Sequence, residues 1–163
     1  MKGRIVCNTG PMIAFAIVDR LDLLSKIFHE VVVPDAVHNE ILDGGTEFLG
    51  LAAYQRASWI KVQELSNPVE PLLRTVLDKG EAAVIQLARE SHAETVLIDE
   101  RKARKVAREI YGMHVVGSAR ILVEAKQRGF IGDVKETITR MRNGGYWIHE
   151  DIVEVILKKA GEE

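Results

Sequence analysis

The chain has little of what several protein classes depend on. It holds one cysteine, Cys7, so an internal disulfide is excluded and the thiol is expected to be a small buried residue. Its longest apolar stretch, Met12 to Val18, is too short to span a bilayer. The charged start is followed by only three apolar residues, too few for the core of a signal peptide. We therefore expect a cytoplasmic protein with no membrane partner.

Two binding motifs are also missing. The five histidines share no spacing typical of metal ligands. No glycine-rich loop follows the first apolar run, which disfavours a nucleotide-binding α/β domain, although the fold class alone allows one.

The composition is that of a globular chain with an uneven charge distribution. At 163 residues, 47% of them hydrophobic, we expect a single domain over 1–163. The formal net charge is only −2, yet residues 101–145 hold eleven Lys and Arg against four Asp and Glu. Such a tract suits a polyanionic partner, and it equally suits a solvated helix face.

Apolar β-branched runs alternate with segments of helical periodicity, which predicts an α/β fold with a mainly parallel sheet. The pattern shows no clear linker, and Gly144-Gly145 is the best breakpoint. Strands are expected at 5–7, 31–33, 59–62, 95–98 and 114–116. Helices are expected near 12–18, 21–28, 34–42, 46–57, 72–77, 81–88, 103–110, 119–129, 133–142 and 149–160.

Four oxygen-bearing side chains stand at the ends of these segments. Asn8 follows the first strand and Asp99 follows the run Thr95 to Ile98. Glu40 lies on the helix that starts at Pro34, and Glu81 opens a helix behind a glycine. All four suit the carboxyl edge of a parallel sheet, where oxygen clusters hold Mg²⁺ or Mn²⁺.

Each of the four also has an ordinary structural explanation. Asn8 and Asp99 could cap the helices that follow them. Glu40 could be an exposed helix residue, and Glu81 in a first helical turn is favoured by the helix dipole alone.

The segments that carry these residues resemble those of PIN-domain proteins. The resemblance starts with Asn8-Thr9-Gly10-Pro11-Met12-Ile13-Ala14 and with Val31-Val32-Val33-Pro34 followed by Glu40-Ile41. It continues with Gly80-Glu81-Ala82-Ala83 and Leu97-Ile98-Asp99-Glu100-Arg101, and it is closest to an uncharacterised prokaryotic branch of PIN-like proteins. The motifs occur in the family's order over about residues 4–125, and in that branch over the tail as well.

This resemblance implies a three-layer α/β/α fold, with a core of about 4–125 and a C-terminal helical extension of about 126–163. It also implies a metal-dependent endoribonuclease. Glu40, Glu81 and Asp99 would be the catalytic carboxylates that, with Asn8, hold Mg²⁺ or Mn²⁺. Thr9 and Ser118 would be hydroxyls that position metal, water or phosphate. Many members are dimers, and many are toxins of toxin–antitoxin modules inhibited by a small partner, so RNA, an antitoxin-type protein and a second copy are the expected partners.

Asn8 is where the chain departs from the family, which usually has Asp there. An amide offers an oxygen without a charge, so metal affinity should fall. The alternative function is therefore a catalytically impaired PIN-like module that binds RNA or a protein partner.

One helix carries a basic stripe beside its apolar one. The apolar stripe comprises Ala103, Val106, Ala107 and Ile110. The basic stripe, Arg101, Arg104, Lys105 and Arg108, is expected to track a nucleic-acid backbone. No aromatic residue interleaves it, so base stacking is not predicted, and Trp59 and Trp147 are expected to be core or interface anchors.

Overall fold

Five parallel strands form one sheet in the order β3-β2-β1-β4-β5. The computed structural model describes residues 1–44 and 49–162. The sheet confirms the expected α/β class and every expected strand. The strands are β1 (Arg4–Cys7), β2 (Glu30–Pro34), β3 (Lys61–Gln63), β4 (Thr95–Leu97) and β5 (His114–Val116).

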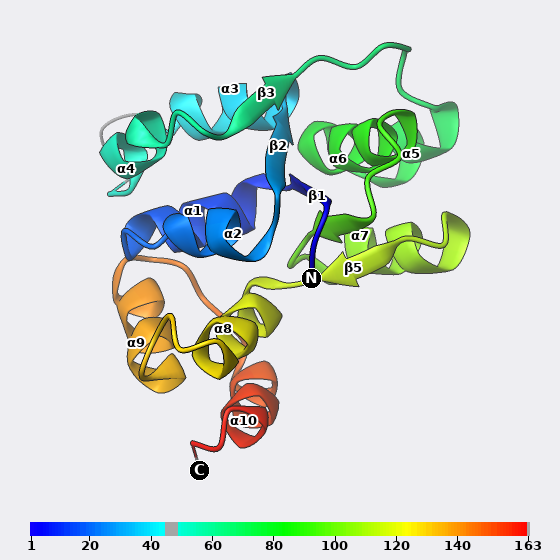
Figure 1. Cartoon of the computed structure of the whole chain (residues 1–163). Coiled ribbons are helices and arrows are strands. Elements are labelled where there is room, and N and C mark those ends of the chain that lie inside the picture. The colour runs from blue at the N-terminus through cyan, green and yellow to red at the C-terminus, as the bar shows by residue number, and fades with distance from the viewer. Residues whose placement is uncertain (45–48, 163) are drawn as a thin grey trace.

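Helices cover both faces of the sheet, which gives the expected three layers (Figure 1). On one side α6 contacts β1, β2 and β4, and α5 packs on α6. On the other side α1 contacts α8 and α9, and α2 contacts β2 and α8. The first of these helices are α1 (Thr9–Ile17), α2 (Asp22–Ile27), α3 (Asp35–Asp43), α4 (Leu51–Arg56), α5 (Pro71–Val76) and α6 (Lys79–Glu90). The others are α7 (Arg101–Lys105), the π-helix η2 (Val106–Ile110), α8 (Ser118–Gln127), α9 (Val134–Asn143) and α10 (Glu150–Lys159).

Burial follows from the apolar runs. The inner strands consist of β-branched residues that are almost fully covered, as Val32 and Val6 show. α1 is apolar on nearly all sides and packs in the interior, as its sequence predicts. Cys7 is buried, and burial raises the pKa of its thiol, so it behaves as an apolar residue.

Two sequence predictions need adjustment. The helix expected over 46–57 is α4, which begins at Leu51, and residues 46–48 lie outside the described residues. Ile110 was placed on the apolar stripe of its helix, but it is 55% exposed. The reason is that the chain widens into the π-helix η2 after Lys105, so positions beyond Ala107 no longer keep the α-helical register.

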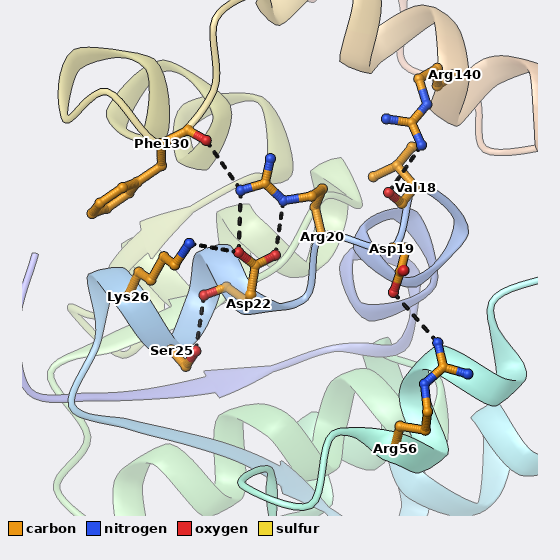
Figure 2. Close-up of polar contacts among 9 residues, drawn as sticks. All are labelled: Val18, Asp19, Arg20, Asp22, Ser25, Lys26, Arg56, Phe130 and Arg140. Atoms are coloured by element: carbon orange, nitrogen blue, oxygen red, sulfur yellow. Dashed lines mark hydrogen bonds and ion pairs between the residues drawn. The ribbon is translucent and has the colours of Figure 1, made fainter.

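Polar contacts tie the C-terminal helices to the first two helices (Figure 2). The Arg20 guanidinium donates to Asp22 and to the Phe130 carbonyl oxygen at 3.2 Å. Arg140 of α9 donates to the Val18 carbonyl oxygen at 3.2 Å. The extension therefore lies on the α1–α2 side of the molecule, where the segment between α9 and α10 can reach the sheet edge. Among the described helices, none is both long and apolar enough to cross a membrane.

Candidate active site

The site lies where the strand order reverses direction. The chain leaves β1 toward β2 on one side, whereas β4 and β5 lie on the other, so the order switches at the carboxyl ends of β1 and β4. Open α/β folds bind ligands at such a switch point, and this region is called the crevice below. Asn8 follows β1 directly, and its backbone N–H donates to the Leu97 carbonyl oxygen at 3.0 Å. Asp99 stands two residues beyond β4. The structure thus brings these two predicted site residues to the same crevice.

Asp99 is held by three donors. Its Oδ1 accepts from the Ser118 backbone N–H at 2.7 Å, and its Oδ2 accepts from the Ser118 hydroxyl at 2.5 Å. The hydroxyl of Tyr146 also donates to Oδ2. Capping does not account for this carboxylate, because the N-cap of α7 is Glu100, which accepts from the Ala103 N–H at 2.7 Å. Ser118, predicted from the resemblance, therefore lies directly on the Asp99 carboxylate.

Asn8 and Glu40 meet at Gly80. A Cβ atom added to Gly80 would lie 2.8 Å from Glu40 Oε2 and 3.6 Å from Asn8 Oδ1. The glycine thus leaves room for two oxygen donors from α3 and from the end of β1. Within the described residues the Asn8 side chain makes no capping hydrogen bond to α1, so the capping explanation fails for this residue. Glu40 itself is exposed.

Glu81 does have a structural role. It forms a capping box with Asp78, in which the Glu81 N–H donates to Asp78 Oδ1 at 2.8 Å and the Asp78 N–H donates to Glu81 Oε1 at 3.2 Å. Burial, together with the nearby charges of Asp78 and Glu100, raises the pKa of Glu81 to about 7. A carboxyl group whose pKa is raised by desolvation and by specific neighbouring charges is a candidate functional group.

Thr9 adds a buried hydroxyl without a partner. Its Oγ1 is covered and has no hydrogen bond to any residue in the described part of the chain. Buried hydroxyls are normally hydrogen-bonded, so an unsatisfied one beside Asn8 is consistent with a ligand atom at this position.

The basic stripe is only partly at the site. Arg104 is half-buried, and its Nη1 donates to the Ile98 carbonyl oxygen at 2.8 Å. A Cβ on Gly117 would lie 2.9 Å from both Arg104 Nη1 and Asp99 Oδ1, so this glycine lets the two groups approach. The other three members, Arg101, Lys105 and Arg108, are exposed.

Tyr146 is a residue of this crevice that the sequence did not reveal. It lies between α9 and α10, and its hydroxyl reaches both Asp99 and the start of α1, where a Cβ on Gly10 would be 3.1 Å away. Burial, followed by the neighbouring Asp99 charge, raises the pKa of Tyr146, so the phenol stays protonated as a donor. No local pattern marks it, because its partners lie far away in the sequence.

The donor types fit a hard divalent cation, although the carboxylates are divided between two places. Asn8 and Glu40 offer oxygens at Gly80, and Asp99 offers a carboxylate in the same crevice. Over residues 1–44 and 49–162, however, no three Asp, Glu, His or Cys side chains are arranged to hold a metal. Asn8 contributes an amide oxygen and no charge to this donor set, and the Asp99 carboxylate is already hydrogen-bonded to Ser118 and Tyr146.

Comparison with known proteins gives one match. A family model described as PIN domain matches residues 4–162, nearly the whole chain. No curated protein and no solved structure matches it significantly.

Proposed function

Since the chain belongs to the PIN-domain family, we propose that it is a Mg²⁺- or Mn²⁺-dependent endoribonuclease. Asn8, Glu40, Glu81 and Asp99 would hold the cation. The observation that carries the proposal is the convergence of Asn8 and Asp99 on the crevice between β1 and β4, where neither side chain serves as a helix cap. Glu40 reaches the same crevice at Gly80.

The residues of the chain would divide the work as follows. A bound divalent cation would polarise the scissile phosphate and lower the pKa of a water molecule. Asp99 is fixed by the Ser118 N–H and hydroxyl, which orient its carboxylate toward the crevice. Glu81 is fixed through one oxygen by the Asp78 N–H, which leaves its other oxygen for a ligand. Arg104 places a positive charge beside Asp99, where a phosphate would arrive.

Two observations on the same residues favour a second function, the binding of RNA or a protein partner without cleavage. Asn8 gives the donor set one negative charge fewer than Asp would, and the Tyr146 hydroxyl donates a hydrogen bond to the Asp99 carboxylate. A protein that binds RNA or a protein partner without cutting would show both features. The toxin role, the antitoxin partner and the homodimer follow from the resemblance alone and stay predictions.

Cleavage of a fluorescently labelled RNA in the presence of Mn²⁺ separates the two functions. We expect cleavage by the native protein, and a loss of roughly 100-fold or more in Asp99→Asn, which keeps an acceptor for the Ser118 N–H but removes the charge. Asp43→Asn, an exposed carboxylate of α3, is the matched control and should leave the rate unchanged. Binding without cleavage by any form supports the second function. Equal cleavage by Asp99→Asn contradicts the first.

A further inference from the structure

A groove of about 530 Å³ opens beside Asp99 and continues away from it. Its one wall is formed by β5 and the start of α8, and the other by the segment between α9 and α10 and by α10 itself. Asp99 lines the groove, and among the described residues that do so it is the only acidic one. A ligand lying in the groove would therefore reach the proposed active site.

Permanent positive charges line this groove. Arg104 lies beside Asp99. Arg120 lies in the first turn of α8, and Lys159 is the last residue of α10. Arg120 shares its charge with Glu124 in an ion pair of 3.6 Å, and it keeps 46% of its side chain exposed. The lining thus carries three cations against one carboxylate, which favours an anionic ligand that extends over several charges.

An exposed indole completes the lining. The sequence predicts a core or interface anchor at Trp147, and because 65% of its surface is exposed, it is not a core residue. The Arg142 guanidinium lies 4.2 Å from the centroid of its ring, and it is itself hydrogen-bonded to Glu150 at 2.9 Å and to the Ile148 carbonyl oxygen. The side chain is therefore oriented by a stacked cation, while much of the ring is open to solvent.

We propose that this groove binds a single-stranded polynucleotide, with a base stacked on Trp147 and phosphates held by Arg104, Arg120 and Lys159. The inference rests on the proposed function in that the backbone of the bound strand would reach Asp99, which is a residue of the proposed active site. A single strand presents both phosphates and the faces of unstacked bases, which suit a groove that combines cations with an exposed aromatic ring. A duplex is excluded as the ligand, because its bases are already stacked on one another and cannot reach the indole.

The sequence did not predict this stacking, because the basic stripe of α7 and η2 contains no aromatic residue. The structure supplies the ring from a different segment. Trp147 lies beyond α9, and it reaches the groove because the C-terminal extension folds back to the end of β5.

The fluorescence of Trp147 allows a direct test of binding. Trp59 is the other tryptophan of the chain, so Trp59→Phe leaves Trp147 as the sole reporter, and circular dichroism checks that the fold is kept. This variant is titrated in EDTA with a short uridine-rich RNA, with DNA of the same sequence, with a duplex of equal length, and with inorganic polyphosphate. We expect saturable quenching by the single strands, and none by the duplex or by polyphosphate.

Labelled RNA and variants with unchanged Trp59 then assign the contacts. We expect Trp147→Ala to weaken single-strand binding by about 10-fold or more. Arg120→Ala should also weaken binding and should reduce its dependence on salt. Arg128→Ala, at the opposite end of α8, is the matched control, because Arg128 also pairs with Glu124 but does not line the groove, and this variant should bind like the parent.

The outcomes for the groove and for the active site are separate. Quenching by the duplex or by polyphosphate as strong as by single strands overturns the inference, as does unchanged affinity in Trp147→Ala. Because all titrations are made in EDTA, single-strand binding supports the groove even if the protein never cuts RNA. Cleavage with unchanged affinity in Trp147→Ala keeps the proposed function and removes this site.

Discussion

At the scale of single residues, the Asp99 carboxylate is the most constrained acid of the crevice. It accepts from Ser118 twice and from Tyr146, whereas Glu81 accepts from the Asp78 N–H. The two Ser118 bonds come from the start of the neighbouring helix α8 and fix the orientation of the carboxylate. The Tyr146 bond is different, because its hydroxyl lies on the crevice side, against Gly10. A cation at Asp99 must therefore compete with a phenol.

This competition predicts a gain of metal affinity when the phenol hydroxyl is removed. Tyr146→Phe should bind Mn²⁺ roughly 5-fold to 10-fold more tightly, since a hydrogen bond to a charged group no longer has to be replaced. Calorimetric titration measures the dissociation constant. Tyr111→Phe is the matched control, because the Tyr111 hydroxyl donates at 2.9 Å to Glu70, outside the crevice. Weaker Mn²⁺ binding by Tyr146→Phe would show that the hydroxyl supports the site instead.

The raised pKa of Glu81 predicts a dependence of folding stability on pH. The pKa of Glu81 is about 7 in the folded chain against an ordinary value of 4.5. As pH rises between these values, the unfolded chain loses this proton and the folded chain keeps it, so stability falls. The cost is complete above about pH 7 and absent near about pH 4.

Glu81→Gln should remove this cost while keeping the capping box, in which Gln also functions. We expect the variant to be more stable than the native protein at about pH 8, by up to about 3 kcal/mol, and equal to it near about pH 4. Urea denaturation at several pH values measures the free energy of unfolding. Glu136→Gln, in the first turn of α9, controls for the loss of a carboxylate at a helix start. A constant difference across the pH range would refute the assignment.

The residues of the crevice differ in how far the sequence could identify them. Asn8, Glu40, Glu81 and Asp99 stand beside segment ends, so the strand and helix pattern indicates a common edge of the sheet. Tyr146 gives no such signal, because its role depends on where the C-terminal extension folds back. Which donors are already engaged, as those of Asp99 are, follows only from three-dimensional contacts.

At the scale of elements, the strands were predictable because each lies at a short apolar segment that contains β-branched residues and is bounded by turns or helices. The helix after β4 was only partly predictable. Its first turn is α-helical and capped by Glu100, but it continues as the π-helix η2, and the spacing of its apolar residues does not distinguish the two. Ile110 is exposed for this reason, and only Arg104 of the basic stripe lines the groove.

Helix packing depends on one glycine at the start of α4. A Cβ on Gly50 would lie 2.6 Å from the Ala16 carbonyl carbon, and a backbone atom of α1 cannot move away as a side chain can. Gly50→Ala should therefore lower the free energy of unfolding by about 1–3 kcal/mol. Thermal and urea denaturation measure the change.

The control for this substitution is Gly132→Ala. No atom lies within 4 Å of a Cβ at Gly132, so its stability should stay within about 0.5 kcal/mol of the native value. Equal stability of the two variants would mean that α4 does not lie against α1 as the structure has it.

At the scale of the whole molecule, the C-terminal extension contacts Asp99 and lines the groove beside it. Glu162 accepts from the backbone N–H groups of Val134 and Lys135 and from Lys126 Nζ, at 2.8, 3.0 and 2.7 Å. Although burial opposes it, the Lys126 and backbone hydrogen bonds lower the pKa of Glu162 to about 2. This clamp joins α10 to α8 and α9, and the segment it closes carries Tyr146 and Trp147.

The extension gives the molecule two features that its N-terminal part lacks. Tyr146 brings a hydroxyl to Asp99, and Trp147 brings a ring to the groove beside it. Under the proposed function, access of a cation to Asp99 and binding of the polynucleotide both depend on the same short segment between α9 and α10.

The proposed function requires that a divalent cation is held by the oxygens at the ends of β1 and β4, with Asn8 among them. Calorimetric titration of Mn²⁺ into the native protein and into Asn8→Asp tests this directly. We expect one site per chain and binding at least about 10-fold tighter in Asn8→Asp, because a carboxylate replaces a neutral amide oxygen. Equal affinity in the two proteins, or no binding by either, would contradict it.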